Sequence, residues 1–149
     1  MIILANLQEA PILGQIDALQ QAAYAIEAQL IGCRDFPPLR ETADDLRRSP
    51  DSFLVFMIDG CPVGCLSFHQ GEGIVEITRL IVSPRYFRRG IASSLLRTLE
   101  NRLPTGSVIV ATTADLNAPA LAAYAKHGYL ASVGPVSEGI ALRRLRKQI

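Results

Sequence analysis

The chain has 149 residues, of which 49% are hydrophobic and 19% are charged, and its formal net charge is +1. This composition excludes intrinsic disorder and low-complexity repeats, and the length predicts one domain, residues 1–149, that buries its own core. The balanced charge argues against binding to nucleic acid or acidic membrane surfaces, and no apolar run approaches the roughly 20 residues of a membrane helix.

The chain begins with a strand signal and a long helix signal. Residues 2–7 are predicted as a short first strand. Apolar residues at steps of three and four over residues 11–31 predict an amphipathic helix, with Ile26 and Leu30 on its apolar stripe. Gly32 then follows as a stop signal.

The middle and end of the chain alternate strands with two further helix signals. Prolines in residues 35–38 predict a loop, residues 39–48 predict a short helix, and Asp59-Gly60 is a hairpin signal. Strands are expected at residues 52–58, 62–69, 74–82, 107–112, 129–133 and 139–145. Helices are expected at residues 91–103 and from the Asn117 N-cap to His127. The element order β-α-α-β-β-β-α-β-α-β-β indicates one mixed α/β layer domain.

The three cysteines, Cys33, Cys61 and Cys65, are expected to be reduced thiols used as small apolar residues. If Cys61 and Cys65 share a strand, their Cα atoms lie about 13 Å apart. That separation excludes a disulfide and a shared metal ion. The N-terminus lacks the basic region and cleavage site of a signal peptide, so we expect a cytoplasmic protein. We expect no bound metal.

The segment from Leu80 to Ala92 carries the strongest functional signal, because an apolar strand ends in an arginine-containing loop that opens a helix. The first amides of a helix are unpaired, and the helix dipole favours negative charge there. Gly90 leaves the backbone accessible, and Arg88 and Arg89 flank the turn. This combination is typical of a pyrophosphate site. The alternative is an ordinary strand-to-helix turn whose glycine is required sterically.

Two segments resemble motifs of a known family. Val82-x-Pro84-x-x-x-Arg88-Arg89-Gly90-Ile91-Ala92 looks like motif A of the Gcn5-related N-acetyltransferases, the GNAT superfamily, whose consensus is Arg/Gln-x-x-Gly-x-Gly/Ala. Phe87 stands where the family has Arg or Gln. Asn117-x-x-Ala120-x-x-x-Tyr124-x-Lys126-x-Gly128-Tyr129 resembles motif B of the same family and follows after one further strand.

The resemblance implies a fold and a co-substrate. The fold is a mixed, mostly antiparallel sheet with helices on both faces, splayed between the strands at residues 74–82 and 107–112. Acetyl-CoA is the implied acetyl donor, and its pantetheine arm pairs with the strand backbone at Leu80, Ile81 and Val82. The implied pyrophosphate contacts are Arg88, Arg89, Gly90, Ile91, Ala92 and Ser93. Further cofactor contacts are expected from Asn117, Tyr124 and Lys126.

The resemblance also implies direct acetyl transfer to a primary amine of a small molecule or protein. Tyr124 matches the family's catalytic acid, and a phenol with an ordinary pKa near 10 can protonate a thiolate. The alternative is a core tyrosine. Glu76 lies where many relatives carry a catalytic glutamate, and burial would raise its pKa to suit a general base acting through water. The alternative is a salt bridge to Arg79, which requires a bulge because the two side chains otherwise point to opposite faces.

Other assignments are left open by the sequence. The second candidate function is a non-catalytic acetyl-CoA-binding sensor or regulatory module, and the presence of both Glu76 and Tyr124 favours the enzyme. Arg79 is expected to be a buried structural partner or to hold a substrate carboxylate. Weaker acceptor-binding candidates are Glu27, Arg34, Asp35, Arg40 and Glu41. The acceptor amine and the formation of a homodimer are not determined.

Overall fold

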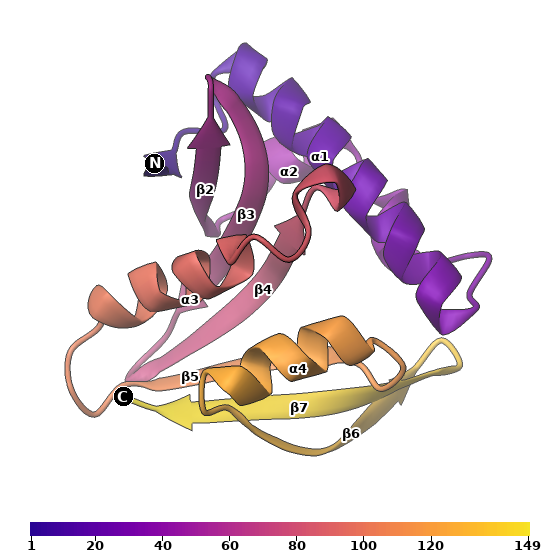
Figure 1. Ribbon diagram of the computed structural model, residues 1–149, viewed down its shortest axis with the longest axis vertical. Helices are drawn as coiled ribbons and strands as arrows, with labels where there is room; N and C mark the ends of the chain where they lie inside the picture. The colour runs from indigo at the N-terminus through magenta and orange to yellow at the C-terminus, as the bar shows by residue number, and fades with distance from the viewer.

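The computed structural model describes residues 1–149 and contains one seven-stranded sheet in the order β1-β2-β3-β4-β5-β7-β6 (Figure 1). The strands are β1 (Ile2–Ala5), β2 (Ser52–Ile58), β3 (Cys61–Gln70), β4 (Ile74–Val82), β5 (Val108–Ala114), β6 (Leu130–Ser137) and β7 (Ile140–Gln148). The helices are α1 (Ala10–Ile31), α2 (Ala43–Arg48), α3 (Ile91–Asn101) and α4 (Ala118–Lys126), with short 3-10 turns η1 (Pro37–Arg40) and η2 (Pro84–Tyr86). This order confirms the predicted mixed α/β fold class. No helix is both long enough and apolar enough to cross a membrane.

Two predicted boundaries are wrong for local reasons. The helix predicted over residues 39–48 begins only after Thr42, because Thr42 and Asp45 form a reciprocal capping box with hydrogen bonds of 2.9 and 3.1 Å. The last two strands are longer than predicted. They meet at Glu138-Gly139, whose positive φ angles of 49° and 79° form a two-residue turn that matches the twist of the hairpin.

The sheet splays between its two central strands, as predicted. All neighbouring strands pair antiparallel except β4 and β5, which run parallel. Their pairing extends only from Ile74 opposite Val108 to Ile77 opposite Ala111. Beyond that point the strands diverge toward the C-terminal end of α1 (Figure 1). The register of β4 with β3 also shifts here, which leaves Thr78 as an extra, bulged residue.

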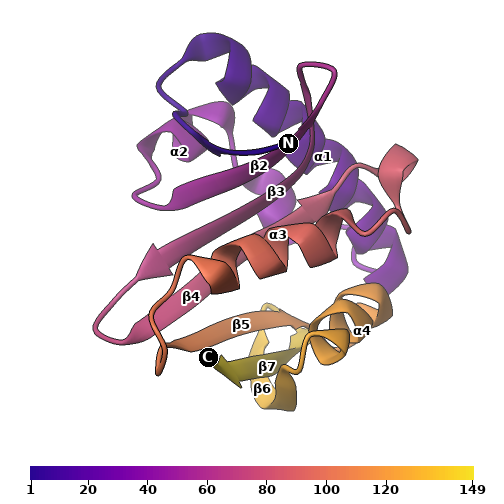
Figure 2. The same cartoon turned by 60° about the vertical axis from the view of Figure 1, so that its left-hand side comes forward.

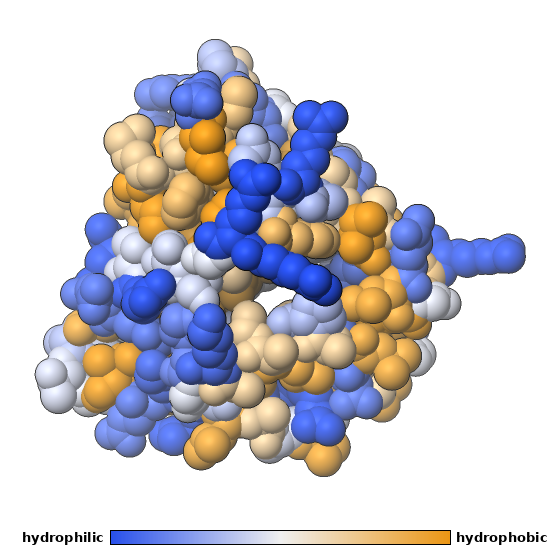
Figure 3. All heavy atoms as spheres, viewed as in Figure 1, coloured by the Kyte–Doolittle hydropathy of each residue, from blue (hydrophilic) through white to orange (hydrophobic).

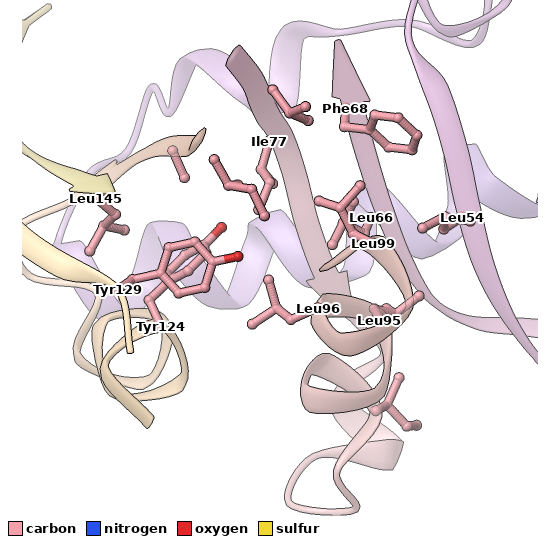
Figure 4. Close-up of a cluster of buried hydrophobic side chains, with 14 of the residues drawn as sticks. Leu54, Leu66, Phe68, Ile77, Leu95, Leu96, Leu99, Tyr124, Tyr129 and Leu145 are labelled. Atoms are coloured by element: carbon pink, nitrogen blue, oxygen red, sulfur yellow. The ribbon is translucent and has the colours of Figure 1, made fainter. Parts of the chain in front are cut away.

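Helices cover both faces of the sheet (Figures 1 and 2). On one face, α3 and α4 pack on a buried cluster that includes Leu66, Leu96 and Leu99 (Figure 4). On the other face, α1 and α2 enclose a second cluster around Ile16 and Leu46. On β2, Phe53 and Val55 belong to the second cluster and Leu54 to the first, as the period of two requires.

The start of α3 is fixed against the sheet by a glycine. A Cβ atom at Gly64 of β3 would lie 2.5 Å from Cγ2 of Ile91, the first residue of α3, so only glycine permits this approach. Ile91 and Leu95 are buried over this position. The contact holds the N-terminal end of α3 directly beside the end of β4, and this placement determines where the loop between them can bind a ligand.

Candidate active site

A cavity of about 360 Å³ lies where β4 and β5 separate. Its walls come from both strands, from α1 on one face of the sheet and from α4 on the other. Its lining includes the side chains of Tyr24, Glu27, Arg79, Asn117 and Tyr124. The remaining wall belongs mainly to the segment around η1 and to the β6–β7 hairpin. Because α1 and α4 cover opposite faces, the cavity connects the two sides of the sheet.

The edge of β4 that faces β5 has no strand partner from Thr78 to Val82. Leu80 and Ile81 line the cavity, whereas Val82 packs partly buried against the main core. An unpaired strand edge presents amides and carbonyls that can pair with an extended ligand. The geometry therefore brings two of the three predicted pantetheine-binding positions to the cavity, and the third lies beside it.

The loop that leads into α3 presents a row of unpaired backbone amides. None of the amides from Phe87 to Ser93 donates a hydrogen bond within the chain. Arg88 (φ 63°) and Gly90 (φ 76°) both adopt the left-handed conformation. The other non-glycine residues with positive φ, Asp59 and Glu138, lie in two-residue hairpin turns. Strain of this kind at Arg88, beside a helix N-terminus with free amides, is typical of an anion-binding loop.

The side chains of this loop add positive charge around the free amides. Arg88 and Arg89 are exposed, and the Arg89 guanidinium lies 5.1 Å from the centre of the Tyr86 ring. Strongly hydrophilic side chains project from this region beside a hollow in the surface (Figure 3). A Cβ atom at Gly90 would meet nothing within 4 Å, so the backbone there is open. These residues fit a pyrophosphate group, although the exposed Phe87 supplies no polar contact.

The other predicted motif A positions lie at the start of α3. Ile91 is buried, and Ala92 and Ser93 are partly buried at the start of α3. Their side chains therefore help to pack the helix against the sheet, while their backbone amides donate no hydrogen bond within the chain.

Tyr124 lies inside the cavity on α4. The residue is 4% exposed, and its ring packs edge-to-face on Tyr129 with the ring centroids 5.2 Å apart (Figure 4). Its hydroxyl makes no hydrogen bond within the chain, although the side chain lines the cavity. Burial raises the pKa of Tyr124 well above its usual value, and the nearby charge of Glu27 acts in the same direction. The phenol is thus held neutral and can serve as a proton donor.

Glu76 does not join this cluster. We expected a buried carboxylate, but the side chain is exposed and lies where β4 still pairs with both neighbours, opposite His69 and Val110. It is not among the residues that line the cavity. The expectation of burial is wrong because Val75 and Ile77 take the core face there and no helix covers the opposite face. The role of Glu76 as base stays a prediction.

Arg79 is a buried structural partner, one of the two alternatives that the sequence left open. Its guanidinium donates to Glu41 at 2.6 Å, to Asp51 at 3.4 Å and to the side chain of Gln20 at 3.0 Å. It also lies 5.2 Å from the centre of the Phe53 ring. The bulge at Thr78 that a salt bridge from Arg79 to Glu76 would require is present. Arg79 nevertheless pairs with Glu41 and Asp51 and not with Glu76.

Asn117 has both side-chain polar atoms engaged within the chain. Its Oδ1 accepts a hydrogen bond from the Ala120 amide at 3.2 Å, which caps α4. Its Nδ2 donates to Oε1 of Glu27 on α1. The other predicted motif B contact, Lys126, is exposed at the last turn of α4 and does not line the cavity.

Glu27 is the residue whose position the sequence analysis missed. The sequence offers it only as a weaker acceptor-binding candidate, but its side chain faces the cavity. Burial raises the pKa of its carboxyl, while the hydrogen bond from Asn117 lowers that pKa. The predicted apolar stripe of α1 is wrong at this end, because Ile26 and Leu30 are 40% and 47% exposed. The available signal was Tyr24, which lies three residues before Glu27 and so on the same helix face.

An ion-paired contact bridges the two segments around the cavity on the side of η1. The Arg40 guanidinium donates to the carboxylates of Asp35 and of Glu138, each at 3.2 Å. Glu138 lies at the tip of the β6–β7 hairpin. Phe36 next to η1 and Ser137 next to this tip both line the cavity. The ion pair between Arg40 and Glu138 therefore lies at the rim of the cavity.

Comparison with known proteins identifies a family and a fold. A sequence model of the acetyltransferase (GNAT) family matches residues 18–129. The chain is 32% identical over 129 residues to the UPF0157 protein YqkA of Bacillus subtilis (strain 168), a match that covers 87% of this chain and 38% of that relative. The chain therefore spans well under half the length of this curated relative.

Two solved structures of the same fold contain coenzyme A or acetyl-CoA. PaiA N-acetyltransferase from Thermoplasma acidophilum in complex with coenzyme A superposes with a TM-score of 0.80 at 16% identity, covering 100% of this chain and 98% of that chain. YncA from Salmonella typhimurium with acetyl-CoA superposes with a TM-score of 0.74 at 18% identity, covering 99% and 92% of the two chains. At these identities the likeness shows the fold.

Proposed function

Because the chain belongs to the GNAT acetyltransferase family, we propose that it is an acetyl-CoA-dependent N-acetyltransferase acting on a primary amine of a small molecule or protein. The observation that carries this proposal is the cavity between β4 and β5, which joins an unpaired strand edge to the unbonded phenol of Tyr124. A donor that is extended, amide-bearing and terminated by a thioester matches such a cavity.

The donor would be held in two chemically different ways. Its pyrophosphate would accept hydrogen bonds from the free amides of residues 88–93, with charge from Arg88 and Arg89. Its pantetheine amides would pair with the backbone of β4 at Leu80 and Ile81. Coenzyme A and acetyl-CoA in the two solved structures of the same fold support this choice of donor.

Transfer would be direct, without an acetylated enzyme intermediate. The residues that line the cavity include no cysteine. Burial raises the pKa of the Cys65 thiol to about 12, so this thiol is not a usable nucleophile. An acceptor amine would therefore attack the thioester itself, and Tyr124 would donate a proton to the departing thiolate.

The test is CoA-thiol release in the presence of acetyl-CoA and a panel of primary amines that includes peptides with a free N-terminus. We expect release to depend on both substrates and to form a new amide on the acceptor. Binding of acetyl-CoA without release for any member of the panel would contradict the enzyme and favour the non-catalytic sensor.

A further inference from the structure

The cavity contains one carboxylate, and it faces the catalytic tyrosine from the opposite layer of helices. Glu27 is the only acidic residue among those that line the cavity. It projects from α1, whereas Tyr124 projects from α4 on the other face of the sheet. Both side chains line the same cavity, and the charge of Glu27 adds to the rise in the pKa of Tyr124 caused by burial.

Asn117 fixes the Glu27 side chain and leaves it able to accept a proton. The Asn117 amide donates to Oε1 of Glu27, and Asn117 is itself held by capping α4. No other hydrogen bond within the chain reaches the Glu27 carboxylate, so Oε2 is free. A carboxylate held in this way is oriented by one oxygen and presents the other to the cavity.

The chain supplies no cation for this carboxylate. Arg79 is the only basic residue that lines the cavity, and its guanidinium donates to Glu41, Asp51 and Gln20 instead. Glu27 forms no salt bridge. A partly buried carboxylate without a basic partner is costly, and a cationic ligand would offset that cost. The group that fits is a primary ammonium, because it is compact and carries three donors.

We propose that Glu27 receives the ammonium group of the acceptor and takes its proton, as the general base opposite Tyr124. This inference rests on the proposed N-acetyltransferase function. One N–H proton moves to Oε2 of Glu27, and the amine lone pair then forms the C–N bond at the thioester carbonyl carbon. The C–S bond breaks, and the thiolate takes the Tyr124 proton. The second nitrogen proton returns to the tyrosine oxygen, and Glu27 releases its proton to water.

The electrostatic surroundings of Glu27 suit this role. Burial raises the pKa of the Glu27 carboxyl, which brings its basicity closer to that of the group it must deprotonate. Tyr24, one helical turn away, also lines the cavity and forms no hydrogen bond through its hydroxyl. The titratable groups that reach this site from the packed elements are therefore the charged Glu27 and Arg79, the latter with its paired carboxylates, and the two neutral phenols of Tyr24 and Tyr124.

The experiment compares steady-state kcat/KM as a function of pH for wild type, Glu27→Gln, Glu76→Gln and Asp17→Asn. Asp17 lies on α1, away from the cavity lining, and is the matched control for removing an acidic charge from this helix. Two acceptor amines with different ammonium pKa values are used. If ionisation of the amine causes the rise of kcat/KM with pH, the midpoint of that rise differs between the two amines. If ionisation of the enzyme causes it, the midpoint is the same for both.

We expect Glu27→Gln to lose about 100- to 10,000-fold in kcat/KM, the usual contribution of general base catalysis, and to lose the pH limb that both amines share. The thermal shift induced by acetyl-CoA should remain, because Glu27 is not one of the loop residues, 88–93, proposed to hold the pyrophosphate. An active wild type together with an unimpaired Glu27→Gln, or the loss of the shared limb in Glu76→Gln instead, would overturn this inference alone. A wild type that acetylates no amine would overturn both it and the proposed function.

Discussion

The side-chain amide of Asn117 donates a hydrogen bond to the carboxylate of Glu27 across the opening between β4 and β5. The contact ties α1 to the first turn of α4, the helix that carries Tyr124. It is supported on the same side of the molecule by the pairing of Arg40 with Glu138, which joins η1 to the β6–β7 hairpin. Two polar links thus join the N-terminal helical segment to the C-terminal half of the sheet around the cavity.

Replacing Glu27 by Gln should stabilise the protein at neutral pH. Burial holds the folded-state pKa of Glu27 above its ordinary value of 4.5, so the folded chain binds the proton more tightly than the unfolded chain. Stability therefore falls as the pH rises from about 4.5 through the folded-state pKa. Glutamine carries no charge, and its oxygen can still accept the hydrogen bond from Asn117. Urea unfolding between about pH 4 and pH 8 measures the difference, and a large loss of stability in Glu27→Gln at pH 7 would contradict the assignment.

Asn117 should influence turnover separately from its role as a helix cap. Asn117→Ser keeps a side chain that caps α4 but removes the donor to Glu27, whereas Asn117→Ala removes both. The alanine variant should be less stable than the serine variant by about 1 kcal/mol. Both variants should show the shared pH limb shifted to higher pH, because the hydrogen bond that lowers the Glu27 pKa is gone. Unfolding curves and pH–rate profiles of the two variants provide the check.

Tyr124→Phe should reduce turnover without reducing stability. The ring keeps its packing on Tyr129, and the hydroxyl makes no hydrogen bond within the chain that the substitution would break. Turnover should fall by about 100- to 10,000-fold, as expected for the loss of a general acid. The thermal shift induced by acetyl-CoA should survive. Normal turnover in this variant would exclude Tyr124 as the acid.

Acetyl-CoA should raise the melting temperature, and the loop before α3 should be responsible. At about 100 times its Kd the donor should stabilise the fold by about 2.7 kcal/mol, which corresponds to roughly 5–10 °C for a chain of this size. Gly90→Ala should weaken this shift, because its Cβ would occupy the open space beside the free amides.

Gly60→Ala is the matched control for that experiment. Gly60 has a φ of 75°, against 76° for Gly90, and a Cβ at either position meets nothing within 4 Å. Both variants should lose about 1 kcal/mol because alanine is strained in the left-handed conformation. Only Gly90→Ala should show a weaker thermal shift with acetyl-CoA, and an equal shift in both variants would show that the loop does not hold the phosphates.

Removing the Arg79 side chain should destabilise the fold strongly. Arg79→Ala leaves Glu41 and Asp51, whose side chains are 28% and 12% exposed, without their common cation. Breaking a buried ion pair typically costs about 3–5 kcal/mol, which corresponds to a fall of roughly 6–20 °C in melting temperature. Arg40→Ala, which removes an exposed arginine, serves as the control and should leave the melting temperature almost unchanged. Thermal unfolding of the two variants at pH 7 makes the comparison.

The candidate site was only partly accessible to sequence analysis. The loop before α3 was predictable because its geometry is local: Gly90 precedes an apolar helix pattern, and a helix start leaves free amides wherever it occurs. Tyr124 was predictable from the spacing of its motif. Glu76 was misjudged because a period of two says which face of a strand a residue occupies but not whether a helix covers that face.

The sequence by itself determined the order of the elements, the hairpin turn at Asp59-Gly60 and the segment proposed to bind the donor, because each depends on residues that are close together in the sequence. The tertiary structure decided which carboxylate meets the tyrosine. Glu27 and Asn117 are 90 residues apart, and they meet only because β4 and β5 separate after Ile77 and α1 crosses the opening. There the helix turns Glu27 inward and leaves Ile26 exposed, since it faces a cavity that also holds the polar groups of Asn117 and Tyr124, and not a filled hydrophobic core.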